Sequence, residues 1–185
     1  MISRRRFLSG LSTSAALLLL AGHTPYRQWK VYRQTHLLVF TSRDDLPSDE
    51  LGERIAARLR ELLPESNAQV ARAPHVARIA SLITTNQADV AVLSRTNAAA
   101  LFARQAPFGD YLPVALRVLV ENERYQLVCR EDFKTEHAYL VAEALAGESG
   151  EPGLTVPAHE GVAEGSVPPH AGALAFAKGE RFDSL

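Results

Sequence analysis

Short apolar runs alternate with amphipathic segments along the middle of the chain. Residues 37–40 and 89–94 are runs of mostly apolar side chains, the pattern of strands buried in a parallel sheet. Residues 67–73 form a short strand-like segment around Val70. Between these segments, apolar side chains recur at helical spacing, first after Asp44 and again after Pro74. This alternation predicts parallel strands that are joined by right-handed crossovers.

The first of these helices is predicted to run from an acidic start to a proline. Asp44, Asp45 and Glu50 suit the first turn, because carboxylates there complement the helix dipole. The apolar face that follows runs from Leu51 until Pro64 ends the helix. A solvated helix start explains the acidic cluster without a catalytic role.

The rest of the chain continues the alternation less regularly. A third helix is predicted over residues 97–104, and extended segments follow at residues 114–121 and 124–130. These two segments form either a hairpin or a bent strand that crosses the sheet. Two more helices are predicted over residues 135–146 and 171–178, separated by a Gly-, Pro- and Glu-rich loop over residues 147–169. The predicted fold is an α/β lobe with a mostly parallel sheet and helices on both faces.

The N-terminus carries an export pattern. Residues 3–8 read S-R-R-R-F-L, which matches the twin-arginine signature at Arg4, Arg5, Phe7 and Leu8. An apolar run over residues 11–22 follows, in the order of a secretory signal. We therefore expect export of the folded domain to the periplasm by the twin-arginine route. A basic amphipathic surface helix is the alternative interpretation of the same residues.

Residues 1–25 are expected to act as a signal peptide or as an anchor. The apolar run is shorter than the about 20 residues that span a bilayer comfortably, and the cleavage pattern around Ala21 is weak. Two outcomes stay open: cleavage near residues 22–26, or retention at the inner membrane by an uncleaved N-terminal segment. We expect residues 26–35 to form a linker and residues 36–185 to form the folded lobe.

Composition narrows the function classes. Hydrophobic residues make up 46% and charged residues 22% of the chain, as in an ordinary globular protein. The formal net charge of −1 lacks the basic excess that nucleic-acid binding normally shows, so no nucleic-acid partner is expected. Cys129 is the single cysteine of the sequence, which excludes an intramolecular disulfide, and a buried structural thiol is its expected state.

The sequence shows no recognisable catalytic or cofactor motif. Its 6 histidines lack metal-ligand spacing, and no nucleophile elbow, P-loop or dinucleotide fingerprint is present. His170 is expected to pack and to cap a helix. We therefore predict a non-catalytic protein with no metal site and no cofactor.

The candidate binding residues follow the three predicted parallel strands. Ligands of open α/β sheets lie outside the carboxyl ends of the strands, and the polar side chains at those ends are Ser42, Arg43, His75, Ser94, Arg95 and Thr96. Together they predict a positive cradle for a small carboxylate ligand. The alternative is that Ser94, Thr96 and Asn97 cap the third helix while both arginines are solvated.

Four stretches of the chain resemble a known family. Residues 86–93 (NQADVAVL) are similar to the G-x-A-D-hydrophobic-A stretch of the TRAP-associated extracytoplasmic immunogenic (TAXI) family of periplasmic solute-binding proteins. The strands at residues 116–119 and 125–130, the helix at residues 136–145 and the motif VPPHAGA at residues 167–173 also resemble that family, in the same order. The resemblance covers roughly residues 36–179.

The resemblance implies a single lobe of a two-lobed protein. Members of the family are clamshells, and they carry a second lobe where Arg130 and Thr135 are almost adjacent here. The chain also departs from the family in two ligand-facing loops. Residues 41–45 replace a Gly-rich loop, and residues 73–75 replace a Gly-Ser pair at a helix start. The expected fold is thus one periplasmic-binding-protein-like lobe, preceded by a signal or anchor helix.

The function that the resemblance implies is transport without catalysis. The chain is expected to be an exported solute-binding component of a TRAP-type or TAXI system that binds a small organic anion. The alternative is an accessory or chaperone-like subunit for a co-exported redox enzyme or a membrane complex. The corresponding partners are an inner-membrane transporter, a redox-enzyme subunit, or a second copy of the chain that recreates a cleft.

Overall fold

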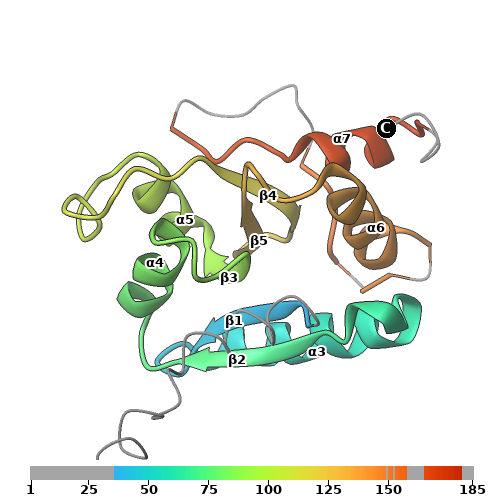
Figure 1. The fold of residues 1–185 in the computed structure, drawn as a ribbon, viewed down its shortest axis with the longest axis horizontal. Helices are drawn as coiled ribbons and strands as arrows, with labels where there is room; N and C mark the ends of the chain where they lie inside the picture. The colour runs from blue at the N-terminus through green and yellow to red at the C-terminus, as the bar shows by residue number, and fades with distance from the viewer. Residues whose placement is uncertain (1–35, 149, 152, 158–164, 181–185) are drawn as a thin grey trace, which may run out of the picture. The chain divides into compact units, whose positions relative to one another are not determined.

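The computed structural model describes residues 36–148, 150–151, 153–157 and 165–180 (Figure 1). The chain divides into two units, Met1–Gln34 and Thr35–Leu185, and the described residues belong to the second. The predicted signal or anchor (residues 1–25) and linker (residues 26–35) lie outside the described residues. Among the residues that are described, no helix combines the length and the apolar character needed to cross a membrane.

The second unit has a mixed α/β fold that is built on one five-stranded sheet. Its strands are β1 (Leu38–Ser42), β2 (Gln69–Ala73), β3 (Val90–Ser94), β4 (Leu116–Glu121) and β5 (Tyr125–Arg130), in the order β2-β1-β3-β5-β4. Strand β1 pairs in parallel with β2 and β3, whereas β5 is antiparallel to β3 and β4. Four of these five strands therefore run in one direction, and the predicted mostly parallel sheet is confirmed.

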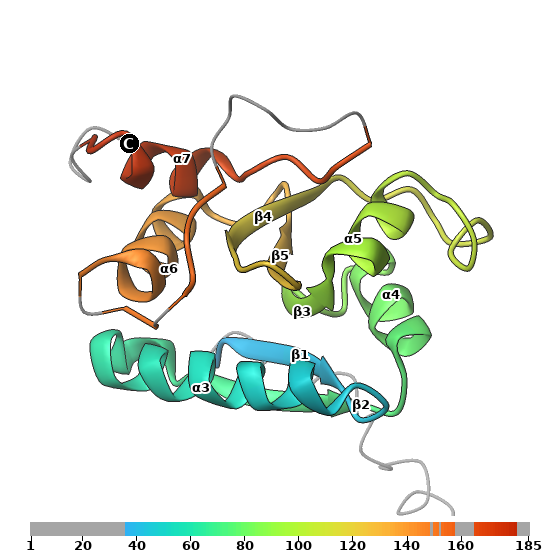
Figure 2. The same ribbon diagram turned by 180° about the vertical axis from the view of Figure 1, so that it is seen from behind.

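Helices cover both faces of the sheet, as the apolar patterns predict (Figures 1 and 2). The elements are α3 (Leu46–Leu62), the 3-10 turn η1 (Pro64–Ser66), α4 (Val76–Thr84), α5 (Arg95–Phe102), α6 (Thr135–Ala146) and α7 (Ala171–Ala177). Val39 joins the hydrophobic cluster under α3 and α6, while its neighbour Phe40 joins the cluster under α4 and α5. Alternate strand residues thus serve two cores, which is why these strands are almost continuously apolar.

The two extended segments of the C-terminal half form a hairpin. Strands β4 and β5 pair antiparallel, with an irregular register between Val118 and Val120. At the turn, Asn122 Oδ1 accepts hydrogen bonds from the backbone N–H groups of Arg124 and Tyr125, at 2.9 and 2.8 Å. Of the two alternatives left open by the sequence, the hairpin is confirmed. Its second strand, β5, lies between β3 and β4.

The predicted loop contributes two short bridges to the outer side of β4. Val118 bridges Pro169, and Glu121 bridges Thr155. The backbone N–H of His170 also donates to the Val118 carbonyl, at 2.8 Å. After His170 the chain enters α7, where Gly172 packs so closely on α6 that an added Cβ would lie 2.1 Å from the Thr135 carbonyl oxygen.

Some element boundaries differ from the predicted ones by one or two residues. Helix α5 begins at Arg95 instead of Asn97, because Ser94 already provides the cap at its N-terminus. Strand β2 begins at Gln69, two residues after Asn67, which has a positive φ of 43°. Helix α6 has the predicted bounds.

Candidate functional site

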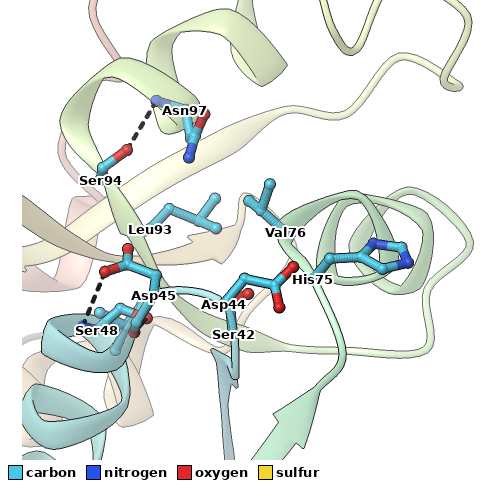
Figure 3. Close-up of a pocket in the computed structure, with 10 residues that line it drawn as sticks. Ser42, Asp44, Asp45, Ser48, His75, Val76, Leu93, Ser94 and Asn97 are labelled. Carbon is cyan, nitrogen blue, oxygen red and sulfur yellow. Dashed lines mark hydrogen bonds between the residues drawn. The ribbon is translucent and has the colours of Figure 1, made fainter.

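The carboxyl ends of β1, β2 and β3 meet at one edge of the sheet and enclose a cavity of about 240 Å³ (Figure 3). From β1 the chain passes through α3 to β2 on one side, and from β2 it passes through α4 to β3 on the other side of β1. This reversal of strand order opens a crevice between β1 and β3, where α/β sheets commonly hold their ligands. The topology therefore places the cavity where binding is expected.

Seven of the ten residues that line the cavity have polar side chains. Its polar residues come from the segments that follow the three strands: Ser42, Asp44, Asp45 and Ser48; His75; Ser94 and Asn97. Val76, Val92 and Leu93 supply the apolar part. Figure 3 shows Val76 and Leu93 between the polar groups of the α3 and α5 segments. The wall therefore combines hydrogen-bonding groups with a substantial apolar surface.

Three helices start at this cavity, and each has a side-chain cap. Asp45 accepts a hydrogen bond from the Ser48 N–H at 3.4 Å, His75 Nδ1 from the Arg78 N–H at 3.2 Å, and Ser94 Oγ from the Asn97 N–H at 3.2 Å. The N-termini of α3, α4 and α5 therefore converge on one volume. Their partial positive charges favour ligand groups that accept hydrogen bonds.

A contact from the hairpin fixes Asp45 in the cavity wall. The Tyr125 hydroxyl, at the start of β5, donates a hydrogen bond of 2.7 Å to Asp45 Oδ1. Burial of the Tyr125 phenol, together with the neighbouring Asp45 carboxylate, raises the pKa of Tyr125 to about 12. The phenol therefore stays protonated at neutral pH, and it donates to a carboxylate that also caps α3.

Ser42 is a buried polar group that lacks a partner. The residue is only 3% exposed, and its Oγ has no hydrogen-bond partner among the described residues. Ser42 ends β1 and lines the cavity. Buried hydroxyls are normally hydrogen-bonded, and one without a partner destabilises the fold unless something fills the gap. The Ser42 hydroxyl therefore keeps its donor and acceptor capacity unused at the cavity.

Only three of the six binding residues that the sequence predicts line the cavity. Ser42, His75 and Ser94 line the cavity, whereas Arg43, Arg95 and Thr96 are exposed and do not belong to its wall. Ser94 also caps α5, so the capping alternative holds for this residue together with its place at the cavity.

Arg95 contacts the β4–β5 hairpin instead of the cavity. Its guanidinium donates to the Asn122 carbonyl at 3.1 Å and pairs with Glu121 at 3.4 Å. With Arg43 also outside the wall, no described Lys or Arg lines the cavity, whereas two carboxylates do. The side chains of the wall therefore do not form the positive cradle that the sequence predicts.

Sequence reasoning missed four polar residues of the wall. The sequence pattern of Asp44 and Asp45 indicates only a solvated helix start, and Ser48 and Asn97 are the residues whose backbone N–H groups donate to the α3 and α5 caps. The acidic pair directly after a buried strand was the available signal. Tyr125 gave none, because it lies 80 residues from Asp45 in the sequence.

Cys129 and His170 are the two other chemically reactive side chains that the sequence brings up, and both are buried in the fold. No group of three or more His, Cys, Asp or Glu that could hold a metal occurs among the described residues. Cys129 is fully buried, and burial raises the pKa of its thiol far above the ordinary value. His170 caps α7 by accepting the Gly172 N–H at 3.1 Å, as expected.

A second hollow, of about 320 Å³, lies at the end of β5 around Arg130. Arg130 hydrogen-bonds Asn86 and forms an ion pair with Asp132, so its charge is already matched within the fold. The cavity at the carboxyl ends of β1–β3 is therefore the better candidate.

Comparisons of the chain with family models, with curated protein sequences and with solved structures found no match. Functional inference therefore starts from the cavity and from the sequence motifs.

Proposed function

We propose that the chain is an exported, non-catalytic solute-binding lobe of a TRAP-type transport system, related to the TAXI proteins that it resembles. In this proposal a small organic molecule binds in the cavity at the ends of β1, β2 and β3. One observation carries the proposal: residues at the N-termini of three helices line this cavity together with Ser42, a buried residue whose hydroxyl has no partner among the described residues.

The fold and the sequence support the same function. A mostly parallel sheet with helices on both faces is the fold class that the resemblance implies. The family-like residues 86–93 lead into β3, whose end lines the cavity, and residues 167–173 run along β4 into α7. The twin-arginine pattern at Arg4 and Arg5 supports a periplasmic location, either free or held at the inner membrane.

The charges of the cavity wall restrict the class of solute that can bind there. The helix N-termini favour an acceptor group, which agrees with the organic anion expected from the sequence. Asp44 and Asp45 act in the opposite direction, because they add negative charge to a wall in which no described basic side chain takes part. The solute is thus held by hydrogen bonds more than by ion pairs.

A second function is favoured by a specific feature of the sequence. Twin-arginine signals export folded proteins, often cofactor-bearing enzymes or their companions, so the lobe would be an accessory subunit for a co-exported redox enzyme or a membrane complex. In that case its partner would be a protein, such as a redox-enzyme or transporter subunit.

Native mass spectrometry of the protein, purified from the periplasmic and membrane fractions, tests the first function. We expect a small bound molecule that is lost in Val76→Trp, which fills the cavity, and retained in Val114→Trp, which fills the second hollow instead. A stoichiometric protein partner without any bound solute would support the accessory role. Equal loss in both variants would show that the bound molecule is not in this cavity.

A further inference from the structure

The cavity wall combines positive helix ends with negative side chains and contains an unused hydroxyl. We propose that it binds a neutral, hydroxyl-rich solute, such as a polyol or a monosaccharide, through Ser42, Asp44 and Asp45. The inference rests on the solute-binding function proposed above and names the chemical class of the solute.

Simple anions fit this wall poorly. Asp44 and Asp45 both line the cavity, and no described Lys or Arg does. Arg95, one of the two arginines that the sequence suggests for this site, pairs with Glu121 at 3.4 Å instead. A carboxylate or phosphate would therefore lie beside two like charges without a cationic side chain to offset them. Asp45 is also the cap of α3, so part of that helix N-terminus is already satisfied.

Simple cations fit it poorly for the opposite reason. The N-termini of α3, α4 and α5 direct partial positive charge at the same volume. The Asp45 carboxylate that would attract a cation already accepts hydrogen bonds from the Tyr125 hydroxyl and the Ser48 N–H. A bare ammonium group would thus meet three helix ends, the partly neutralised Asp45 carboxylate, and Asp44, whose carboxylate is exposed to solvent and therefore attracts a cation only weakly.

A hydroxyl group suits both parts of the wall because it donates and accepts. It can donate to Asp44, which is exposed, and to the remaining acceptor sites of Asp45, and hydrogen bonds to an ionised carboxylate are among the stronger ones. It can accept from the first-turn N–H groups of α4, which have no partner within the helix. A solute with several hydroxyls can make both kinds of contact at once.

Ser42 gives this solute a specific anchor. Its side chain is buried at the end of β1, it lines the cavity, and its Oγ is unpaired within the described chain. The Ser42 hydroxyl can donate to or accept from one hydroxyl of the solute, which would remove the cost of an unsatisfied buried group. Val76, Val92 and Leu93 then contact the C–H groups of the same solute.

The size of the cavity agrees with a small solute. Its volume of about 240 Å³ lies below the range of about 300–1,000 Å³ that is usual for sites that bury drug-sized ligands. A polyol or a single sugar ring is therefore the upper limit for one lobe.

The test is a calorimetric and thermal-shift comparison of three matched sets of solutes with the purified protein. The sets are neutral polyols and sugars (glycerol, myo-inositol, D-glucose, D-ribose), carboxylates (succinate, 2-oxoglutarate) and amines (choline, putrescine). We expect binding only in the first set. Ser42→Ala should weaken it by about tenfold, which corresponds to the loss of one good hydrogen bond, while the unfolding temperature of the free protein stays the same or rises.

Asp44→Asn should weaken the same binding, because it removes a charged acceptor from the wall. Glu50→Gln is the matched control: it removes one carboxylate from an exposed position of α3 outside the cavity wall, and should leave binding unchanged. Binding of carboxylates that Asp44→Asn strengthens would overturn the proposed solute class and leave solute binding itself intact. Absence of binding in all three sets would overturn the proposed function, and this inference with it.

Discussion

The Tyr125 hydroxyl and Asp45 Oδ1 are 2.7 Å apart, although the two residues are separated by 80 positions in the sequence. The hydrogen bond joins the start of β5 to the cap of α3, and it does so at the cavity wall. The β4–β5 hairpin therefore positions a carboxylate that belongs to the first crossover of the sheet.

Removal of this hydrogen bond should destabilise the protein measurably. Tyr125→Phe keeps the buried ring and deletes only the hydroxyl, and hydrogen bonds to charged groups typically contribute about 1.5–3 kcal/mol. We expect a loss at the lower end of that range, because Asp45 is only half-buried. Urea unfolding of the two proteins measures the difference. An unchanged midpoint would show that solvent replaces the phenol without cost.

The same bond predicts a loss of stability at high pH. The pKa of Tyr125 is raised in the folded protein from 10.0 to about 12 by burial and by Asp45. A group whose pKa is raised on folding stabilises the protein fully below its unfolded pKa, and this contribution is lost as pH rises through the folded pKa. The stability advantage of the native protein over Tyr125→Phe should therefore shrink from pH 10 towards pH 12. Unfolding free energies measured across this window test it, and a constant difference would contradict it.

Gly52 permits the close approach of α3 to β1. A Cβ at this position would lie 2.3 Å from the Thr41 Cγ2 atom. Gly52→Ala should therefore destabilise the fold by about 1–3 kcal/mol, as overpacking does, although alanine is otherwise the better helix former.

Thr41→Ser supplies the control for Gly52→Ala, because it removes Cγ2 and keeps the hydroxyl. The double variant should recover most of the loss that Gly52→Ala causes in thermal unfolding. A double variant no more stable than Gly52→Ala would show that the helix is displaced by some other contact.

Asp49 should matter more for stability than its ion-pair partner Arg72. Asp49 accepts a hydrogen bond of 2.7 Å from the hydroxyl of Thr41, which is fully buried, and it pairs with the exposed guanidinium of Arg72 at 2.9 Å. Asp49→Ala leaves the Thr41 hydroxyl unpaired, at a cost of about 1–3 kcal/mol. Arg72→Ala removes only a surface pair, which usually contributes little.

Asp49→Asn separates the two effects, because the amide oxygen can still accept from Thr41. Denaturant unfolding should rank the variants, from most to least stable, as Arg72→Ala, Asp49→Asn and Asp49→Ala. If Arg72→Ala were the least stable, the ion pair would be the main contribution.

We expect the titration of His170 to lower the stability of the protein at mildly acidic pH. Burial lowers its pKa below 6.5, although backbone acceptors at Glu131 and Phe133 oppose this shift. The unfolded chain then binds a proton at a higher pH than the folded chain does, so stability falls as pH drops below about 6.5 towards the folded pKa. His170→Asn keeps a good helix cap and cannot titrate. Its unfolding free energy should depend less on pH between 7 and 5 than that of the native protein, and an equal slope would contradict this role.

Much of the fold follows from local patterns in the sequence. Strands β1 and β3 are short apolar runs because both of their faces are buried, and the start of α5 is encoded in the Ser94 cap. The place of β5 was not predictable in this way. Its insertion between β3 and β4 depends on pairing between segments that are far apart in the chain, and local propensity carries no information about such pairing.

The candidate site was predictable in position but not in charge. Topology brings the ends of β1, β2 and β3 together, and Ser42, His75 and Ser94 line the cavity there. Side-chain direction is decided by partners elsewhere: Arg95 pairs with Glu121 of the hairpin, and Asp45 is held by Tyr125. Because these partners are remote in sequence, the residues around each strand end could not show which charge faces the cavity.

The bridges from Thr155 and Pro169 have a consequence for self-association. Both lie on the outer side of β4, where they occupy backbone groups that an edge strand otherwise offers to another chain. A chain truncated before residue 165 would lack Pro169 and leave uncovered a strand whose side chains include Leu116, Val118 and Val120. Such an uncovered apolar edge is a template for pairing between molecules, so we expect the C-terminal segment to limit aggregation as well as to complete the fold.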